Sequence, residues 1–402
     1  MPHVRSVSVG VWVDRGSRHE SPEENGLSHF TEHMVFKGAG GRSAEEIACS
    51  IDAIGGYLDA FTTKESVAFT AKVLDEHLPR ALDIVSDLVL HPAFPEGDVE
   101  KEKGVVLEER KMDEDNPDYL LNEIFTSSFW PGHAIGRSII GTPDSIGSFS
   151  RGGLQSFFDR TFHAGNFIIT AAGRLDHNAF VRLVEERFGG LDARRSPVQE
   201  PAPSPAPAIV MHDKPSLEQV HLSLGVGAHP MADPRRFAGY VLSAMLGGGF
   251  SSRLFLKIRE REGLAYAVFS DLSLYSDTGC MSVYAGTSLE AAPQVIRLAL
   301  KELRDLTDNL APDEELRRAK EHLKGSLMLS LESTSSRMSN LARQEKYFER
   351  SLSLDEVLEH IEEVSAAQVR ALAADLFQQD RLALTVLGDL QGWSVNRDDL
   401  AF

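Results

Sequence analysis

Hydrophobic residues recur at every second position in several short segments of the chain. The clearest case lies between residues 7 and 13, where four valines alternate with Ser8, Gly10 and Trp12. A period of two predicts a β-strand with one buried face. Further segments that are rich in β-branched, aromatic or alternating residues also predict strands: 57–70, 166–173, 220–226 and 279–285.

Other hydrophobic residues follow the three-to-four spacing of an α-helix. Leu78, Leu82, Val85 and Val89 would share one face of a helix, with polar residues between them. The alternation of strands and helices along the chain indicates sheets that are covered by helices. Further segments predicted to be helical are 98–112, 154–162, 177–188, 237–246, 292–306 and 313–332.

The plan of the first half of the chain returns in the second half. Residues 377–388 resemble residues 162–173, and the two segments are 215 positions apart. We therefore predict an internal duplication, in which each copy is an α/β sandwich of one sheet covered by helices. Prolines and alanines dominate the segment between the copies, which is typical of a semi-extended linker. The predicted domains are 1–194 and 216–402, joined by a linker at 195–215.

Composition and charge narrow the class of protein. The chain has 402 residues, of which 42% are hydrophobic and 25% charged, as in a soluble protein with more than one domain. No signal peptide or membrane-spanning segment is visible, so we predict a cytoplasmic or organelle-matrix location. The net charge of −19 argues against nucleic acid as a partner. It is compatible with basic peptides, although solubility alone would explain it equally well.

The first candidate for chemistry is the segment around His29, Glu32 and His33. On a helix these three residues share one face, because they are three and four positions apart. Two neutral imidazoles from one helical turn suit Zn²⁺, and a catalytic zinc also needs a third protein ligand and a nearby base. Glu32 fits the role of that base. A partly exposed helix that happens to carry these residues is the alternative.

A second charged helix offers the missing ligand. Within residues 98–112, Glu102 and Glu109 are seven positions apart and therefore share a face. One of these carboxylates could complete the metal site, although a solvated face is the usual meaning of such a charged run. At the corresponding place in the second half, residues 242–246 contain no metal-ligand types. The metal site is therefore predicted in the first half only.

These residues resemble a known family, the pitrilysin-type zinc metallopeptidases or inverzincins, along essentially the whole chain. The chain is most similar to short bacterial members that resemble the beta subunit of the mitochondrial processing peptidase. The resemblance implies an α+β fold with two duplicated domains, each a mostly antiparallel sheet covered by helices. It also implies that Glu109, rather than Glu108, is the third zinc ligand after His29 and His33. Glu102 would support the ligands.

The second half carries another match to the family. Residues 259–268 resemble a family segment in which an arginine and a tyrosine seven positions apart contact the substrate at the scissile bond. The resemblance assigns these roles to Arg259 and Tyr266, with Arg261 as the less favoured arginine. Cationic and phenolic donors suit a developing oxyanion. Without the zinc motif, a surface arginine and a core tyrosine would be the better interpretation.

Together these features predict a zinc metalloendopeptidase that hydrolyses peptides or unfolded polypeptides in a closing chamber. The family pairs two such chains, which implies a homodimer in which Arg259 and Tyr266 serve the partner's zinc, or a heterodimer with a related zinc-free subunit. A catalytically silent structural or binding subunit is the alternative, and the retained ligands and base argue against it. An extended peptide is expected at an edge strand, where its predicted contacts are Asp59, Ala60, Phe61 and Thr62.

Overall fold

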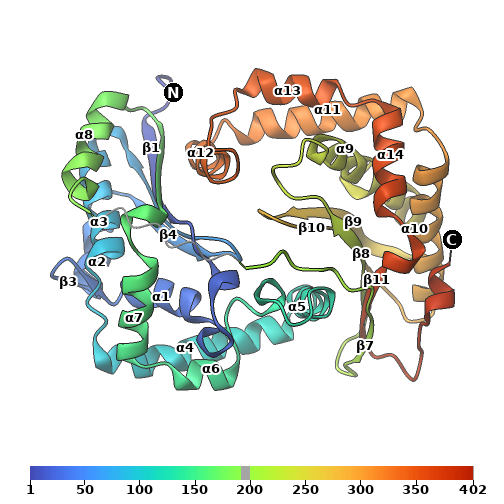
Figure 1. The fold of residues 1–402 in the computed structure, drawn as a ribbon, viewed down its shortest axis with the longest axis horizontal. Helices are drawn as coiled ribbons and strands as arrows, with labels where there is room; N and C mark the ends of the chain where they lie inside the picture. The colour runs from blue at the N-terminus through green and yellow to red at the C-terminus, as the bar shows by residue number, and fades with distance from the viewer. Residues whose placement is uncertain (192–199, 402) are drawn as a thin grey trace. The chain divides into compact units, whose positions relative to one another are not determined.

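The structure is a computed structural model that describes residues 1–191 and 200–401. Its helices and strands form two compact units (Figure 1). Unit 1 comprises Met1–Met112, Arg137–Glu200 and Leu329–Ser351, and unit 2 comprises the remaining segments. Each unit contains one main sheet with its own hydrophobic core. The predicted α+β class is thereby confirmed.

The sheet of unit 1 has four antiparallel strands in the order β4-β5-β1-β6. The alternating valines lie in β1, and all four of their side chains are fully buried against helices. Hydrophobic burial of this kind stabilises the strand at the centre of its sheet. The strands are β1 (Ser6–Val13), β4 (Tyr57–Thr62), β5 (Val67–Leu74) and β6 (Phe167–Gly173), with a short hairpin of β2 (Gly38–Ala39) and β3 (Arg42–Ser43) beside them.

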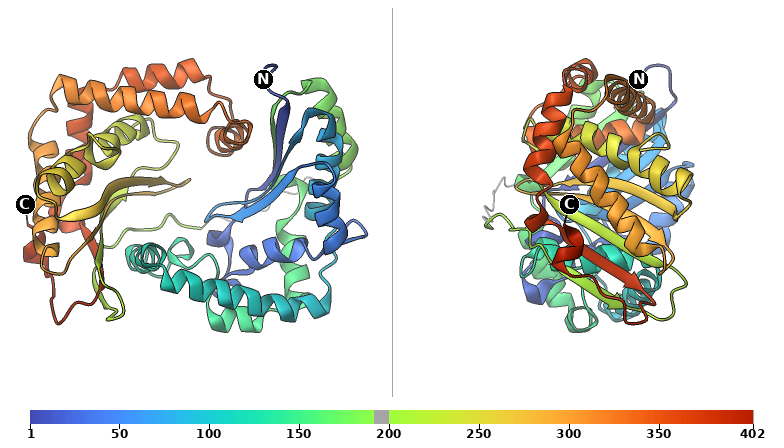
Figure 2. Two further views of the ribbon diagram at one scale, coloured as in Figure 1. Left: turned by 180° about the vertical axis from the view of Figure 1, so that it is seen from behind. Right: turned by 90° about the vertical axis from the view of Figure 1, so that its right-hand side faces the viewer.

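Helices cover both faces of this sheet (Figures 1 and 2). The prediction of one buried face for β1 is therefore wrong, because Met338 and Ala342 of α12 bury Trp12 on the second face. The two residues lie more than 300 positions beyond Trp12 in the sequence. The helices of unit 1 are α1 (Leu27–Val35), α2 (Ala44–Asp52), α3 (Leu78–Leu90), α4 (Glu96–Asp115, which extends past the unit boundary), α6 (Pro143–Ser148), α7 (Arg151–Thr161), α8 (His177–Phe188) and α12 (Thr334–Phe348).

The sheet of unit 2 repeats the same strand order and adds one strand. Its order is β7-β11-β8-β10-β9, in which only the pair β7–β11 is parallel. The strands are β7 (Ile209–Asp213), β8 (Val220–Ala228), β9 (Ala265–Leu274), β10 (Gly279–Thr287) and β11 (Ala383–Gly388). The helices are α5 (Pro117–Phe129), α9 (Arg236–Gly247), α10 (Ala292–Asp308), α11 (Asp313–Ser330), α13 (Leu354–Glu362), α14 (Ala366–Leu376) and the π-helix Phe255–Arg261.

The proline-rich segment differs from the predicted linker. Residues 195–199 lie outside the described residues, but Ile209–Asp213 form strand β7 rather than a linker. This strand forms because its backbone pairs with β11 and because Ile209 and Met211 pack against the core of unit 2. A segment with this many prolines can still contribute a strand at the edge of a sheet, where β7 lies.

Each compact unit includes one helix that lies on the other side of the proline-rich segment in the sequence. Helix α5 belongs to unit 2, where Phe125 and Phe129 are buried near Cys280 and Ala383. Helix α12 belongs to unit 1. The contiguous ranges 1–194 and 216–402 therefore do not describe how the core residues group in space. Among residues 1–191 and 200–401, no helix combines the length and the apolar character needed to cross a membrane.

Candidate metal centre

Helix α1 carries two of the predicted ligands and is fixed at its start. The preceding residue, Gly26, has a positive φ of 99°, and a Cβ there would lie 2.3 Å from the carbonyl oxygen of Ile140. The buried carboxylate of Glu20 accepts hydrogen bonds from the backbone N–H of Gly26 at 2.8 Å and of Ser28 at 2.6 Å. A carboxylate at a helix N-terminus satisfies amide groups that lack helical partners. This end of the helix is therefore held in one position.

The opposite faces of α1 have different surroundings. Phe30 and Met34 are fully buried in the core of unit 1. His29 and His33 project from another face, and their ring centroids are 4.6 Å apart. The apolar face therefore anchors the helix, and the histidine pair is held toward α4.

Helix α4 supplies the third residue of the cluster. The Nε2 atoms of His29 and His33 lie 3.5 Å and 3.4 Å from the two carboxylate oxygens of Glu109. One ligand atom from each of the three residues lies within 4.8 Å of the others. Glu108 instead has a side chain that is 71% exposed and pairs with Lys111. The structure thus brings Glu109, and not Glu108, to the two histidines.

Glu102 lies on the same helix and orients one histidine. Its Oε1 atom is 2.9 Å from Nδ1 of His33, and its Oε2 atom is 2.7 Å from Nζ of Lys37. Because Nδ1 is engaged by Glu102, the Nε2 atom of His33 faces Glu109. Carboxylates that hold the second nitrogen of a ligating histidine in this way occur at many metal sites.

The donor set fits a zinc ion. Two imidazole nitrogens and one carboxylate oxygen match a three-ligand catalytic zinc site with one position left for water. Glu109 Oε2 is buried and has no hydrogen-bond partner among the described residues, which is unusual for a buried carboxylate oxygen. The part of the chain that the structure describes contains no second group of this kind.

The electrostatics of the cluster also favour a cation. The imidazoles of His29 and His33, which face its two carboxylate oxygens, hold the pKa of Glu109 far below its ordinary value. Burial alone would lower the pKa of His33, but the neighbouring carboxylates of Glu109 and Glu102 raise it overall. Since the two carboxylates stabilise a positive charge on His33, the same charges would stabilise a bound metal cation.

Glu32 lies beside the cluster and is held by strand β4. Its Oε2 atom accepts a hydrogen bond of 2.6 Å from the hydroxyl of Thr62, the last residue of the strand. Burial raises the pKa of Glu32, and the Thr62 hydrogen bond opposes that rise. A carboxylate with a raised pKa is suited to accept a proton and to release it later.

Strand β4 lies at the edge of its sheet. Its alternating pattern puts Ala60 and Thr62 on the more buried side, and Asp59 and Phe61 on the more exposed side. Phe61 is 37% exposed, and its ring meets Trp12 edge-on at 5.5 Å. The four residues predicted to contact a peptide therefore lie on an edge strand whose last residue, Thr62, contacts Glu32.

The structure brings Arg259 and Tyr266 together in unit 2. Arg259 donates a hydrogen bond of 2.7 Å to the carbonyl oxygen of Tyr266, and its guanidinium lies 4.7 Å from the centre of the Tyr266 ring. Arg259 is in the π-helix, a type of segment often found at functional sites. Tyr266 is 77% exposed, so its hydroxyl is available to a ligand. The alternative, Arg261, is exposed at the end of the π-helix.

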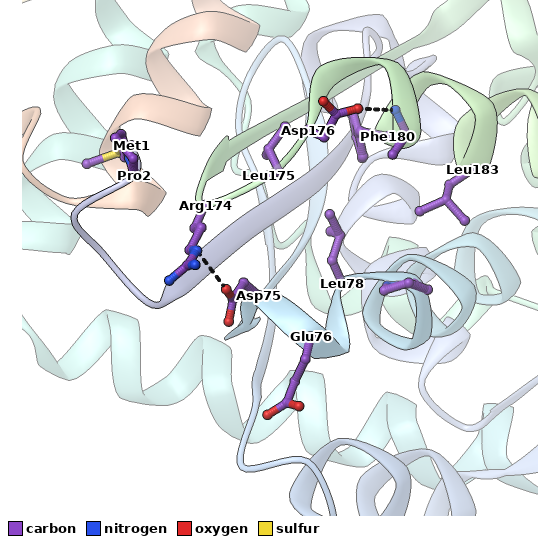
Figure 3. A pocket seen from close by; sticks show the side chains of 12 residues that line it. Met1, Pro2, Asp75, Glu76, Leu78, Arg174, Leu175, Asp176, Phe180 and Leu183 are labelled. Atoms are coloured by element: carbon purple, nitrogen blue, oxygen red, sulfur yellow. Dashed lines mark hydrogen bonds and ion pairs between the residues drawn. The ribbon is translucent and has the colours of Figure 1, made fainter.

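A cavity of about 640 Å³ opens elsewhere in unit 1, beside the first residues of α3 and α8 (Figure 3). Arg174 and Asp75 form an ion pair of 3.1 Å at its wall, and Asp176 caps α8 by accepting a hydrogen bond from Ala179. None of the residues of the histidine–glutamate cluster lines this cavity. It is therefore separate from the candidate metal centre.

Sequence reasoning did not find three supporting contacts. Lys37 lies four residues after His33, so helical spacing could have suggested it as a partner on that face. Glu20 and the contact of Thr62 with Glu32 gave no local signal, because their partners come from separate turns or strands. Thr62 was predicted only as a peptide contact.

Comparisons with known proteins define the class. Residues 1–143 match a family model described as Insulinase (Peptidase family M16), and residues 148–323 match one described as Peptidase M16 inactive domain. The chain belongs to the M16 peptidase family, the insulinase or pitrilysin type. The family resemblance inferred from the sequence is thereby confirmed.

Several proteins named as zinc proteases are similar to this chain along nearly their whole length. The uncharacterized zinc protease YmxG of Bacillus subtilis is 40% identical over 379 residues, which cover 94% of this chain and 92% of that protein. An uncharacterized zinc protease of Rickettsia felis is 34% identical, with coverage of 98% and 95%. The chain is thus similar to short M16 proteins over both of its halves.

Solved structures show the same fold. A protease from Helicobacter pylori superposes with a TM-score of 0.90 at 20% identity, covering 96% of this chain and 95% of that chain. A peptidase M16 inactive domain from Pseudomonas fluorescens superposes with a TM-score of 0.88 at 22% identity, covering 96% and 94%. The two-sheet arrangement described above is therefore common to these proteins.

Proposed function

We propose that the chain is a zinc-dependent endopeptidase whose metal ligands are His29, His33 and Glu109. The observation that carries this proposal is the meeting of these three side chains, within 4.8 Å between ligand atoms, next to Glu32. Membership of the M16 family and relatives named zinc proteases support a metallopeptidase function. Peptides or unfolded polypeptides enclosed in a chamber are the proposed substrates.

A zinc ion at this site would polarise the scissile carbonyl and lower the pKa of a water molecule. Glu32 takes a proton from the attacking water and later gives it to the nitrogen of the leaving amine. The hydrogen bond from Thr62 to Glu32 keeps the carboxylate in one orientation during both transfers. Glu102 holds the ring of His33 through Nδ1, with Lys37 balancing its charge.

Peptide binding is proposed at the edge of β4. A substrate added there as an extended strand would contact Asp59, Ala60, Phe61 and Thr62 through its backbone and alternate side chains. Because the strand ends at Thr62, a peptide on this edge would approach Glu32. The net charge of −19 is compatible with basic peptides among these substrates.

Arg259 and Tyr266 are proposed to stabilise the oxyanion of the substrate. The guanidinium and the exposed phenol are both hydrogen-bond donors, and their mutual contact of 4.7 Å presents them as one group. We propose that they serve the zinc site of a second chain in a dimer. We further propose that the chain acts in the cytoplasm, which is one of the two locations predicted from the sequence.

The first experiment tests the metal and the base. Zinc content and cleavage of a quenched peptide library are measured for the wild type and for Glu32→Gln, Glu109→Gln and Glu108→Gln. Glu109→Gln should lose zinc and activity, whereas Glu32→Gln should keep zinc and lose activity about 10²- to 10⁴-fold, the usual contribution of a general base. The exposed Glu108→Gln is the matched control and should change neither.

A wild type without metal and without activity would refute the proposal. It would instead favour a catalytically silent structural or binding subunit. Activity that appears only after addition of a related zinc-free chain would favour the heterodimer over the homodimer.

The second experiment tests the proposed action in trans. A Glu32→Gln chain and a Tyr266→Phe chain should each be nearly inactive alone. Mixed and allowed to exchange, they should recover part of the activity, because one site in the mixed dimer has an intact base and an intact tyrosine. If no activity returns although mixed dimers are detected, the trans arrangement is wrong.

A further inference from the structure

The loop that follows strand β4 is fixed to a neighbouring turn. Residues 63–66 connect β4 to β5, directly after Thr62, and the backbone N–H groups of Ser17 and Arg18 donate to the carbonyl oxygens of Thr63 at 3.1 Å and Lys64 at 2.8 Å. A Cβ at Gly16 would lie only 2.3 Å from the carbonyl oxygen of Thr63. The turn and the loop are therefore packed backbone to backbone.

A buried ion pair joins the same two segments. Nη1 of Arg18 lies 2.8 Å from Oε1 of Glu65, and the side chains are 4% and 5% exposed. Charges taken out of water destabilise a protein unless hydrogen bonds satisfy them. A buried pair in this place therefore needs further donors to Glu65.

Helix α12 supplies those donors. The hydroxyl of Tyr347 donates to Oε2 of Glu65 at 2.6 Å, and Nζ of Lys346 donates to the carbonyl oxygen of Glu65 at 2.7 Å. Lys346 also pairs with Asp14 at the end of β1. The side chain and the backbone of Glu65 are thus both held by a helix from the other half of the sequence.

We infer that Tyr347 and Lys346 are positioning residues for the candidate general base. They fix Glu65, which fixes the loop, and the loop fixes Thr62, whose hydroxyl orients Glu32. The inference rests on the proposed function, because it assigns the two residues to the reaction of that site. Neither residue is proposed to touch substrate or metal.

The test is steady-state cleavage of one quenched peptide by zinc-loaded wild type and by Tyr347→Phe, which removes a single hydroxyl. We expect kcat to fall about fivefold to tenfold, as for loss of one hydrogen bond that positions a reacting group, with KM and zinc content unchanged. The matched control is Ser335→Ala, which removes a contact of 3.1 Å with Ser8 of β1. It weakens the other end of α12 and should leave kcat unchanged.

A double-mutant cycle separates positioning from a general structural role. In a Thr62→Ala background, Tyr347→Phe should cost no further kcat, because its effect passes through the Thr62 hydroxyl. Lys346→Met should behave in the same way and provides a second variant if Tyr347→Phe does not fold.

The outcomes are distinguishable. The positioning role would be overturned if kcat were unchanged in both Tyr347→Phe and Lys346→Met. It would also be overturned if these substitutions lowered kcat equally in the wild-type and Thr62→Ala backgrounds. Either result would leave the proposed function intact. If Ser335→Ala lowered kcat by the same factor, the effect would come from the docking of the whole helix α12, and the positioning role would again be overturned. A wild type without zinc-dependent cleavage would refute the proposed function itself.

Discussion

His19 should make the stability of the protein depend on pH in a defined direction. It lies in the turn that binds the loop after β4, and its Nδ1 atom accepts a hydrogen bond of 3.1 Å from the backbone N–H of Gly16. Burial lowers the pKa of His19 from 6.5 to about 3, and the positive charges of Arg15, Lys346 and Arg18 add to the effect. The folded protein therefore keeps this imidazole neutral.

The sign and size of the effect follow from proton binding. In the unfolded chain His19 takes up a proton below its ordinary pKa of 6.5, whereas in the folded chain it does so only near pH 3. Its contribution to stability is complete above pH 6.5 and is lost as the pH falls from 6.5 toward 3. At pH 5 the loss amounts to about 2 kcal/mol, with a slope of about 1.4 kcal/mol per pH unit.

The assay compares the wild type with His19→Asn, whose side-chain oxygen can still accept the Gly16 hydrogen bond. The free energy of unfolding is measured in urea between pH 7.5 and pH 5, with metal removed from both proteins. All other titrating groups are shared, so they cancel in the difference. The wild type should lose about 2 kcal/mol relative to the variant over this range. Parallel curves would refute the assignment of a neutral histidine at this position.

Two further substitutions test other parts of unit 1. Glu102→Gln should weaken zinc binding about 10- to 100-fold, because the amide orients His33 less firmly; titration against a chelator measures this, and unchanged affinity would contradict the role. Gly173→Ala should destabilise the fold by about 1–3 kcal/mol through backbone strain. Its φ is 137°, and a Cβ there would lie 2.4 Å from the carbonyl oxygen of Ser6. The control Gly104→Ala, in the exposed interior of α4 with nothing near a Cβ, should instead stabilise the protein by about 0.5–1 kcal/mol in thermal or urea unfolding.

Local periodicity was sufficient for many elements. The valines of β1 and the leucine and valine stripe of α3 were readable because both patterns depend on residues within one strand or helix. The burial of β1 on both faces was not readable, since the covering helix α12 is distant in sequence. Strand β7 was not predicted, because its proline-rich surroundings indicated a linker and only two of its apolar residues pack on the core.

The candidate metal site shows the same limit. His29 and His33 could be paired from sequence, because one helical turn separates them. Spacing within α4 left Glu102 and Glu109 as alternatives, and only the crossing of α1 and α4 gives them different neighbours: Glu109 reaches both histidines through Nε2, and Glu102 reaches Nδ1 of His33. Such a distinction depends on tertiary packing that no local pattern contains.

Each unit includes a helix from the other half of the sequence, and this limits when unit 1 can finish folding during synthesis. Helix α12 ends at Phe348, so the sheet of unit 1 keeps the face around Trp12 uncovered until that residue has left the ribosome. Until Tyr347 and Lys346 are synthesised, the buried pair of Glu65 and Arg18 likewise lacks the hydrogen bonds that these residues donate to Glu65. A gene fragment that ends at the proline-rich segment would thus encode every predicted zinc ligand but would lack helix α12. The first half of the duplication therefore needs the second half of the chain to complete the packing of its own sheet.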